Sequence, residues 1–227
     1  MTRSDRRELA ELLGVDEKDL RGYQPHYNIA PLQDHFVIRS KYEGRELLPA
    51  RWGLVNSWAT NGGSAASCIN AKAETIETRP SFKDAFAKRR CLVPADGFYE
   101  WRGRKDYREP LWIHSVTGGL LWLAGLYEVW QPEPGRWQRT FTIITIGANR
   151  LLEPVHDRMP VILDERAAED WMNPGERDLL QLKALLKPAP DEDLVLSPAS
   201  SLVNSVKNDG PELLVPDRTI AVQRSLF

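Results

Sequence analysis

The sequence predicts an α+β fold: a single compact β-rich domain in which a bent or barrel-like mixed sheet carries peripheral helices. Three observations predict it. The chain has 227 residues, which is long enough to bury a sizeable core as one domain. Apolar residues make up 42% and charged residues 27%, as in soluble globular proteins. Short β-branched or aromatic segments bounded by Gly, Pro or Asn dominate the middle. We therefore expect one domain over residues 1–227.

A short helix is predicted at the start of the chain. Ser4 can cap it, Leu9, Leu12 and Leu13 share one face, and Gly14 can end it. Strands then follow, with Pro132 to Gly135 as a hairpin turn. The predicted strands are His35 to Arg39, Leu47 to Gly53, Ala66 to Asn70, Cys91 to Ala95, Phe98 to Arg102, Leu111 to His114, Leu120 to Trp130 and Thr140 to Ile146.

Three further helices are predicted between and after these strands. Ser81 to Lys88 carries an apolar stripe that includes Phe82 and Phe86, and Asp164 to Met172 and Glu176 to Leu186 lie near the end of the chain. No internal repeat, low-complexity tract or long linker separates the elements. The helices are therefore expected at the periphery of the sheet.

The charge of the chain gives arguments both for and against binding to nucleic acid. A net charge of −2 provides no general attraction to DNA. Residues 72–108 are locally basic, with ten Lys or Arg against six Asp or Glu, whereas residues 164–227 are acidic, with seven against twelve. The basic runs are either solvated loops and helix ends or part of a binding surface.

The sequence offers no sign of a membrane, a secretory path or a cofactor. No apolar run approaches the roughly 18 residues of a membrane span, and the first residues lack a signal-peptide core, so we expect a cytoplasmic protein. Cys68 and Cys91 form neither a disulfide framework nor a metal cluster. Glycine-rich nucleotide motifs, a nucleophile elbow and zinc-spaced histidines are absent. We therefore expect no cofactor and no metal.

Glu100 is the clearest candidate for acid or base chemistry. It follows the glycine turn at Gly97 and lies between Tyr99 and Trp101. Burial there would raise the pKa of the carboxyl group toward the range useful for proton transfer. The alternative is an ordinary strand glutamate that points to water.

His156 and Asn70 are two further candidates. His156 stands between Pro154 and Pro160 in a loop that enters a strand, and the prolines restrict its backbone. A lone histidine is more often structural, although its pKa suits proton transfer. Asn70 shares a strand face with Lys72 and Cys68 if that segment is extended. Asn is disfavoured in strands. Asn70 is therefore expected either to form a turn or a cap or to have a functional role.

Tryptophans next to an arginine suggest a binding surface. Trp52 and Trp58 follow Arg51 closely, and aromatic side chains beside arginine form stacking platforms for single strands. The alternative is that both tryptophans belong to the core.

Five blocks in order carry a family resemblance. They are Asn28 to Pro31, Arg51 to Leu54, Asn70 to Thr75, Pro94 to Trp101 and His156 to Pro160, and Asn204 to Pro211 follows as a closing segment. In this order they resemble the signature blocks of the SRAP (SOS response-associated peptidase) family of abasic-site processing proteins. The resemblance covers nearly the whole chain. It implies a β-rich domain with a positively charged groove that senses abasic sites in single-stranded DNA.

The resemblance also implies a reaction. An opened abasic deoxyribose presents an aldehyde, and the family's mature N-terminal cysteine attacks it with its amine and thiol to close a thiazolidine ring, which is a covalent cross-link. Asn70 would position the amine, Glu100 would transfer protons, and His156 would assist at the sugar oxygen. The family's peptidase activity would expose its own cysteine.

The remaining implied residues contact the DNA. Arg51, Lys72 and Arg158 would contact phosphates, while Trp52, Trp58 and Pro31 would shape a groove that splays bases apart. Lys72 stands where the family more usually has arginine, so charge is retained without the planar bidentate contact. The expected partner is abasic single-stranded DNA bound by a monomer, without metal or membrane.

The first residues depart from the family pattern, which begins Met-Cys-Gly-Arg-Phe. Here Thr2 follows Met1 directly, and Thr2 and the internal Cys68 are poor replacements for a cysteine that supplies both an amine and a thiol. Two hypotheses follow: a start upstream that supplies the cysteine and a covalent sensor, or a non-covalent binder of single-stranded or damaged DNA. A thiol peptidase acting on other proteins lacks a suitable Cys–His spacing.

Overall fold

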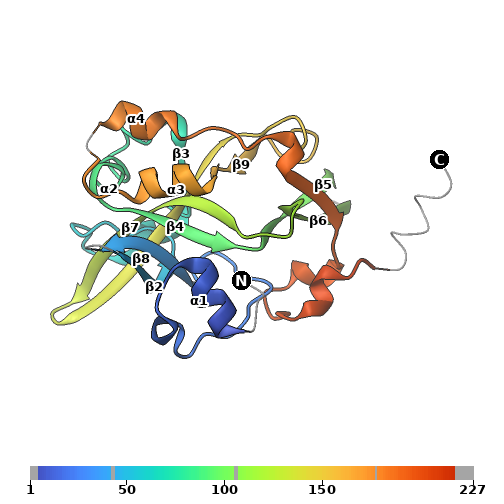
Figure 1. The fold of residues 1–227 in the computed structure, drawn as a ribbon, viewed down its shortest axis with the longest axis horizontal. Coiled ribbons are helices and arrows are strands. Elements are labelled where there is room, and N and C mark those ends of the chain that lie inside the picture. Colours follow the sequence, from blue (N-terminus) through green and yellow to red (C-terminus); the bar gives the residue numbers. More distant parts are fainter. Residues whose placement is uncertain (1–4, 42–43, 105–106, 177, 218–227) are drawn as a thin grey trace.

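Five strands close into a barrel at the centre of the computed structural model, which describes residues 5–41, 44–104, 107–176 and 178–217 (Figure 1). Neighbouring strands follow the order β7, β4, β1, β2, β8, and β8 pairs again with β7. The β2–β8 pair is parallel and the other barrel pairs are antiparallel. The strands are β1 (Asp34–Lys41), β2 (Gly44–Trp52), β4 (Arg90–Ala95), β7 (Leu121–Glu133) and β8 (Arg136–Gly147).

Short strands extend the barrel, and a second sheet lies beside it. The parallel strand β3 (Asn70–Lys72) and the antiparallel strand β9 (Arg158–Pro160) both pair with β8, and β10 (Ile162–Leu163) pairs with β7. The second sheet is ordered β11 (Leu194–Pro198), β6 (Tyr107–Ser115) and β5 (Gly97–Arg104). The predicted β-rich architecture with a barrel-like mixed sheet is therefore confirmed.

The strands bury two cores because successive side chains point to opposite faces. Ile38, Leu92 and Ile144 belong to one buried cluster together with side chains of the helices. Val37 and Val93, each next to one of those residues, belong to the other cluster, which continues to the second sheet. In Figure 1 the helices α2 (Lys83–Lys88), α3 (Glu165–Met172) and α4 (Leu179–Ala184) gather away from the β5–β6 sheet.

Helix α1 (Arg6–Leu13) differs from its prediction at both the cap and the apolar face. The Asp5 carboxylate caps it by accepting from the backbone N–H groups of residues 7 and 8, and Ser4 lies outside the described residues. Leu9 and Leu13 are buried, but Leu12 is 39% exposed, because only one side of the helix touches the barrel. Gly14 ends the helix at φ 65°, as predicted.

Helices α2 and α3 end against one buried arginine. The Arg90 guanidinium donates to the carbonyl oxygens of Phe86, Ala87, Trp171, Asn173 and Glu176 at 2.7–3.2 Å. These groups lie at or just beyond the helix C-termini, where carbonyls lack intrahelical partners and carry partial negative charge. Arg90 therefore joins both helices to the barrel.

The predicted strand Ala66 to Asn70 is wrong. Ala66 and Ser67 end the 3₁₀ helix η2 (Gly62–Ser67), and only Asn70 enters β3. The Asn61 side chain caps η2 by accepting from the Gly63 N–H. Asn70 and Lys72 do share the exposed face of β3, but Cys68 precedes the strand and is buried. The predicted helix Glu176 to Leu186 is also shorter, because α4 begins only after the Asp178 cap.

The remaining elements are short and lie mostly between the strands. Strands β9, β10 and β11 lie outside the predicted strands. The other 3₁₀ helices are η1 (Glu17–Leu20), η3 (Ala73–Thr75), η4 (Asp191–Asp193), η5 (Ser201–Asn204) and η6 (Pro211–Leu214). None of the described helices is long and apolar enough to cross a membrane.

Candidate functional site

A cavity of about 480 Å³, here called the main cleft, lies between the barrel and the second sheet. Barrel side chains such as His35, Phe141 and Ile143 line one side, and Phe98, Tyr99 and Trp101 of β5 line another. Residues 26–31 and Val203, Asn204 and Val206 complete the wall. An apolar cleft with a few polar groups of this size is typical of sites that bind small or planar groups.

Three of the predicted site residues line the main cleft: Pro31, Trp52 and Asn70. The Trp52 ring stacks on Phe141 with centroids 6.2 Å apart and planes 16° from parallel. Its indole Nε1 donates to the Ile69 carbonyl at 2.8 Å, directly before Asn70. Trp52 is therefore fixed as one wall of the cleft, and Asn70 lies at the edge of the same wall.

Asp209 ties the loop at residues 26–28 to the end of the described chain. Its carboxylate accepts from the backbone N–H groups of Tyr27 and Asn28 at 2.5 and 2.9 Å, and it lies 2.6 Å from the His26 Nδ1. The Asn28 amide donates to the carbonyls of Val203, Ser205 and Asn208. This network, called the Asp209 clamp below, holds two cleft-lining segments together across the chain.

Glu100 and His156 interact with one another rather than with the cavity itself. Burial raises the pKa of Glu100, and the charge of His156 partly offsets the rise, so the predicted direction of the shift is confirmed. The His156 Nδ1 lies 2.9 Å from the Arg158 backbone nitrogen, 3.1 Å from the Arg158 carbonyl oxygen and 3.3 Å from the Asp157 carboxylate, which fix the position of the ring. Neither residue lines the main cleft, although Trp101, which follows Glu100, does.

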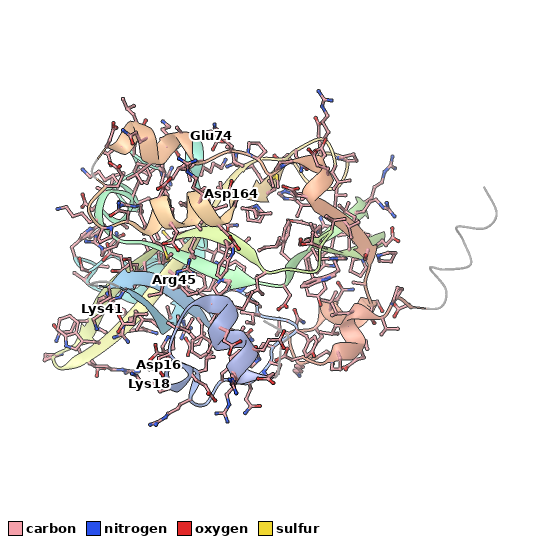
Figure 2. The ribbon with its side chains drawn as sticks, in the orientation of Figure 1. Asp16, Lys18, Lys41, Arg45, Glu74 and Asp164 are labelled. Carbon is pink, nitrogen blue, oxygen red and sulfur yellow. The ribbon has the colours of Figure 1, made fainter. Side chains whose placement is uncertain are left out.

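Arg158 is paired with a carboxylate. Its two terminal nitrogens donate to the Glu74 carboxylate at 2.6 and 3.0 Å, and Nη2 also donates to the Thr145 carbonyl. The ion pair lowers the pKa of Glu74. Glu74 is labelled in Figure 2. Lys72, whose charge also lowers the pKa of Glu74, is an exposed residue of β3, and both β3 and the strand of Arg158, β9, pair with β8. These two of the three predicted phosphate contacts thus lie on strands that both pair with β8, and the charge of Arg158 is already compensated.

Arg51 and Trp58 lie away from the main cleft. Arg51 lines a second cavity of about 290 Å³ together with Trp130, Gln138 and Leu32. Trp58 is 65% exposed, so its alternative assignment to the core is wrong. It precedes Ala59, whose carbonyl accepts from the Trp130 indole at 2.8 Å, which places Trp58 close to the second cavity.

The locally basic segment is partly structural. Arg90 is buried, Arg89 pairs with the buried Glu128 at 2.5 Å, and Arg102 pairs with Glu109 across the β5–β6 hairpin. Counting charges over residues 72–108 therefore overstates the surface available for phosphates. Cys68 and Cys91 are both buried, and burial raises the pKa of the Cys91 thiol.

The sequence analysis placed Asn28 and Asp209 in two of its family blocks but did not predict the contact between them, and it assigned no role to the buried His35. Asp209 stands in an Asn-Asp-Gly-Pro turn sequence, but its partners are more than 180 positions away, so no local pattern identifies them. His35 alternates with apolar neighbours in a strand, and burial lowers its pKa to about 3. Within the described ranges, no three His, Cys, Asp or Glu side chains are grouped so as to hold a metal ion.

Comparison with known proteins shows which family and which relatives the chain is similar to. The family described as SOS response associated peptidase (SRAP) matches residues 1–206. The abasic site processing protein YoqW of Bacillus subtilis is 40% identical over 210 residues, covering 91% of this chain and 93% of its own length. Abasic site processing protein HMCES of Gallus gallus is 33% identical over 226 residues, covering 86% and 67%.

A solved structure from Bacteroides thetaiotaomicron has the same fold. It superposes with a TM-score of 0.77 at 27% identity and covers 95% of this chain and 92% of its own. The arrangement of barrel, second sheet and helices is thus shared over nearly the entire chain.

Proposed function

The chain belongs to the SOS response-associated peptidase family, and on that premise we propose that it processes abasic sites in single-stranded DNA at the main cleft. The observation that carries the proposal is that Asn70 lines the cleft next to Ile69, whose carbonyl binds Trp52, together with a part-buried Glu100 that interacts electrostatically with His156. Relatives named for abasic site processing, at 30–41% identity, support it.

The polar groups suit an aldehyde better than an intact nucleotide. An abasic sugar lacks a base, so an apolar cleft walled by Trp52, Trp101 and Phe98 can admit it beside the bases that flank it. The Asn70 amide supplies both donor and acceptor atoms for an amine or a sugar hydroxyl. Glu100, whose pKa is raised by burial, holds its proton to a higher pH than an exposed carboxyl group does and can release it to a leaving oxygen.

The covalent chemistry follows when a cysteine stands at the mature N-terminus. Its unprotonated α-amine adds to the sugar aldehyde, and loss of water gives an imine. The thiol then adds to the imine carbon, its proton passes to nitrogen, and a thiazolidine ring closes. Glu100 and His156 would carry the protons that leave and return in these two steps. Release of the residues that precede the cysteine would be the peptidase activity of the same site.

Non-covalent binding is a second candidate function for the described residues. Both cysteines are buried in the two cores, and neither lines the main cleft. Without a thiol from outside those residues, the cleft would hold an abasic sugar by shape and hydrogen bonds alone.

Two measurements separate these functions. Fluorescence anisotropy should give tighter binding to an abasic oligonucleotide than to its intact counterpart in either case. A denaturant-resistant adduct should form only from a chain that carries an N-terminal cysteine. Glu100→Gln should slow that adduct at least tenfold while leaving non-covalent affinity unchanged. Glu109→Gln, on the neighbouring strand and paired with Arg102, is the matched control. Equal affinity for intact and abasic strands would overturn the proposal.

A further inference from the structure

Leu32 has an unusual backbone conformation. It is the only non-glycine residue of the described part with a positive φ, at 68°, a region that L side chains rarely adopt. Its N–H donates to the Trp52 carbonyl at 2.8 Å, and the Trp52 N–H donates to the Gln33 carbonyl at 2.9 Å. Two hydrogen bonds to the same strand residue therefore hold the strained turn in place. Strain of this kind tends to persist where it has a task.

The strained turn leaves an apolar side chain at the surface. Leu32 is 37% exposed, and its Cδ2 would lie 3.1 Å from a Cβ added to Gly53. Gly53 itself has φ 129°, and an added Cβ would also come within 2.8 Å of the Ala65 carbonyl oxygen. The missing side chain at Gly53 therefore provides the space on which Leu32 rests.

Leu32 lies on the ridge between the two cavities. Trp52 lines the main cleft and its neighbour Arg51 lines the second cavity, as expected for consecutive strand residues that point to opposite faces. Consecutive residues of the adjoining loop also line different cavities, since Pro31 lines the main cleft and Leu32 lines the second cavity. A strand that crossed this ridge would place one nucleotide in each cavity.

The second cavity has the chemistry of a base subsite. The edge of the Trp130 ring packs closely on Gly62, where an added Cβ would be 3.3 Å away, so a glycine leaves room for this aromatic ring in the lining of the cavity. Gln138 adds a polar side chain to this lining. Within the described ranges the Arg51 side chain has no hydrogen bond or ion pair, so its guanidinium is available to a phosphate at the rim.

We propose that the second cavity takes a nucleobase adjacent to the abasic nucleotide, that Arg51 contacts the phosphate between them, and that Leu32 is the wedge that separates the two. Apolar side chains inserted between bases unstack them at the cost of stacking energy, which the bound conformation then offsets. This inference rests on the proposed function of the main cleft. It adds a second subsite and a residue that sets how the strand bends.

Removal of the flanking base tests the subsite. Binding is measured with oligonucleotides that carry a tetrahydrofuran abasic analogue, which has no aldehyde and so reports non-covalent affinity alone. In two further oligonucleotides the base on the 5′ or the 3′ side is removed as well. One of these should bind the parent chain about fivefold or more weakly, as expected for loss of one stacked base.

Variants of the ridge and the cavity should abolish this difference. Leu32→Gly removes the wedge, and Ala66→Leu fills the cavity from an exposed position; both should bind the oligonucleotides with and without the flanking base equally. Leu12→Ala, with nearly the same exposure as Leu32, should behave as the parent. Because glycine tolerates positive φ, Leu32→Gly should also unfold at the same or a higher temperature.

The outcomes are distinct. If the parent chain binds the abasic analogue more tightly than intact DNA, but equally well with and without the flanking base, the proposed subsite is overturned and the proposed function of the main cleft stands. The same holds if both variants retain the parent's fivefold difference. No preference for the abasic analogue at all would overturn the proposed function and this inference together.

Discussion

Arg158 and Glu74 form a two-point ion pair, with the terminal guanidinium nitrogens 2.6 and 3.0 Å from the two carboxylate oxygens. A cation expected to contact phosphate is therefore held by an internal anion on η3. A DNA phosphate that reaches Arg158 must share it with this carboxylate, which lowers the gain from the contact.

Glu74→Gln should release Arg158 and strengthen binding to single-stranded DNA severalfold. The plot of log affinity against log salt should steepen by about 0.7, the contribution of one further phosphate contact to a single strand. Anisotropy titrations at several salt concentrations measure both quantities. Glu11→Gln on α1, which removes the same charge from an exposed pair with Arg7, is the control. Equal slopes for the two variants would contradict the expected release.

Glu100 should make stability depend on pH in a defined direction. Burial raises its pKa in the folded protein, so the folded state binds more protons than the unfolded chain at pH values between the ordinary carboxyl pKa of 4.5 and the raised pKa. Its contribution to the free energy of unfolding is then present at low pH and falls as pH rises through that window. Urea denaturation of the parent and Glu100→Gln across pH 4–8 should show the difference between them shrink or reverse with rising pH. A constant difference would contradict a raised pKa.

The Asp209 clamp should control local order more than global stability. Burial acts to raise the pKa of Asp209, but hydrogen bonds from His26, Tyr27 and Asn28 lower it overall, so this contribution is lost only as pH falls through the lowered pKa. Asp209→Ala should cost about 1–2 kcal/mol, because the side chain is partly exposed and two backbone donors lose their acceptor.

Hydrogen exchange locates the effect of that variant. The amides of Tyr27 and Asn28 should lose protection, while amides of the barrel strands keep theirs. Asp217→Ala, which removes a carboxylate bonded to Ser200 and Ser201, is a matched control in the same segment. Uniform loss of protection after Asp209→Ala would show that the clamp supports the entire fold.

Arg90→Met should destabilise the protein strongly without touching the cleft. The change leaves five carbonyl oxygens without their buried donor, and each unsatisfied buried group costs about 1–3 kcal/mol. Since water can reach some of them, we expect a loss of roughly 3 kcal/mol or more. Arg90→Lys should be nearly as unstable, because one ammonium cannot span both helix ends. Denaturant unfolding measures the loss, and unchanged DNA affinity below the transition shows that the cleft is intact.

The sequence predicts the parts of the fold that follow from local patterns. Short β-branched or aromatic segments bounded by Gly, Pro or Asn identified the barrel strands, and Gly135, with φ 81°, makes the predicted hairpin turn between β7 and β8. The η2 segment could not be predicted in the same way. Its small residues Gly62 to Ser67 carry no periodic signal, and their shape depends on Trp130 and Gly53, which are distant in the chain.

In the candidate site, too, some features follow from local sequence and others do not. The direction of the Glu100 shift follows from its aromatic neighbours, but the pairing of Arg158 with Glu74 joins positions 84 residues apart. The wedge at Leu32 depends on a φ value that a leucine seldom adopts, so a propensity argument would have excluded it. The Arg158–Glu74 pair and the conformation of Leu32 depend on tertiary contacts, which no local pattern in the sequence indicates.

Adduct formation on a denaturing gel tests the central claim most directly. The chain is prepared as given and with Met-Cys-Gly-Arg-Phe placed ahead of Thr2 at the family's spacing, and each form is incubated with abasic and intact single-stranded oligonucleotides. We predict a heat-stable shifted band only from the cysteine-bearing form with the abasic strand, and a band at least tenfold slower to form in Glu100→Gln. A band with intact DNA, or none from the cysteine-bearing form, would contradict abasic-site processing at the main cleft.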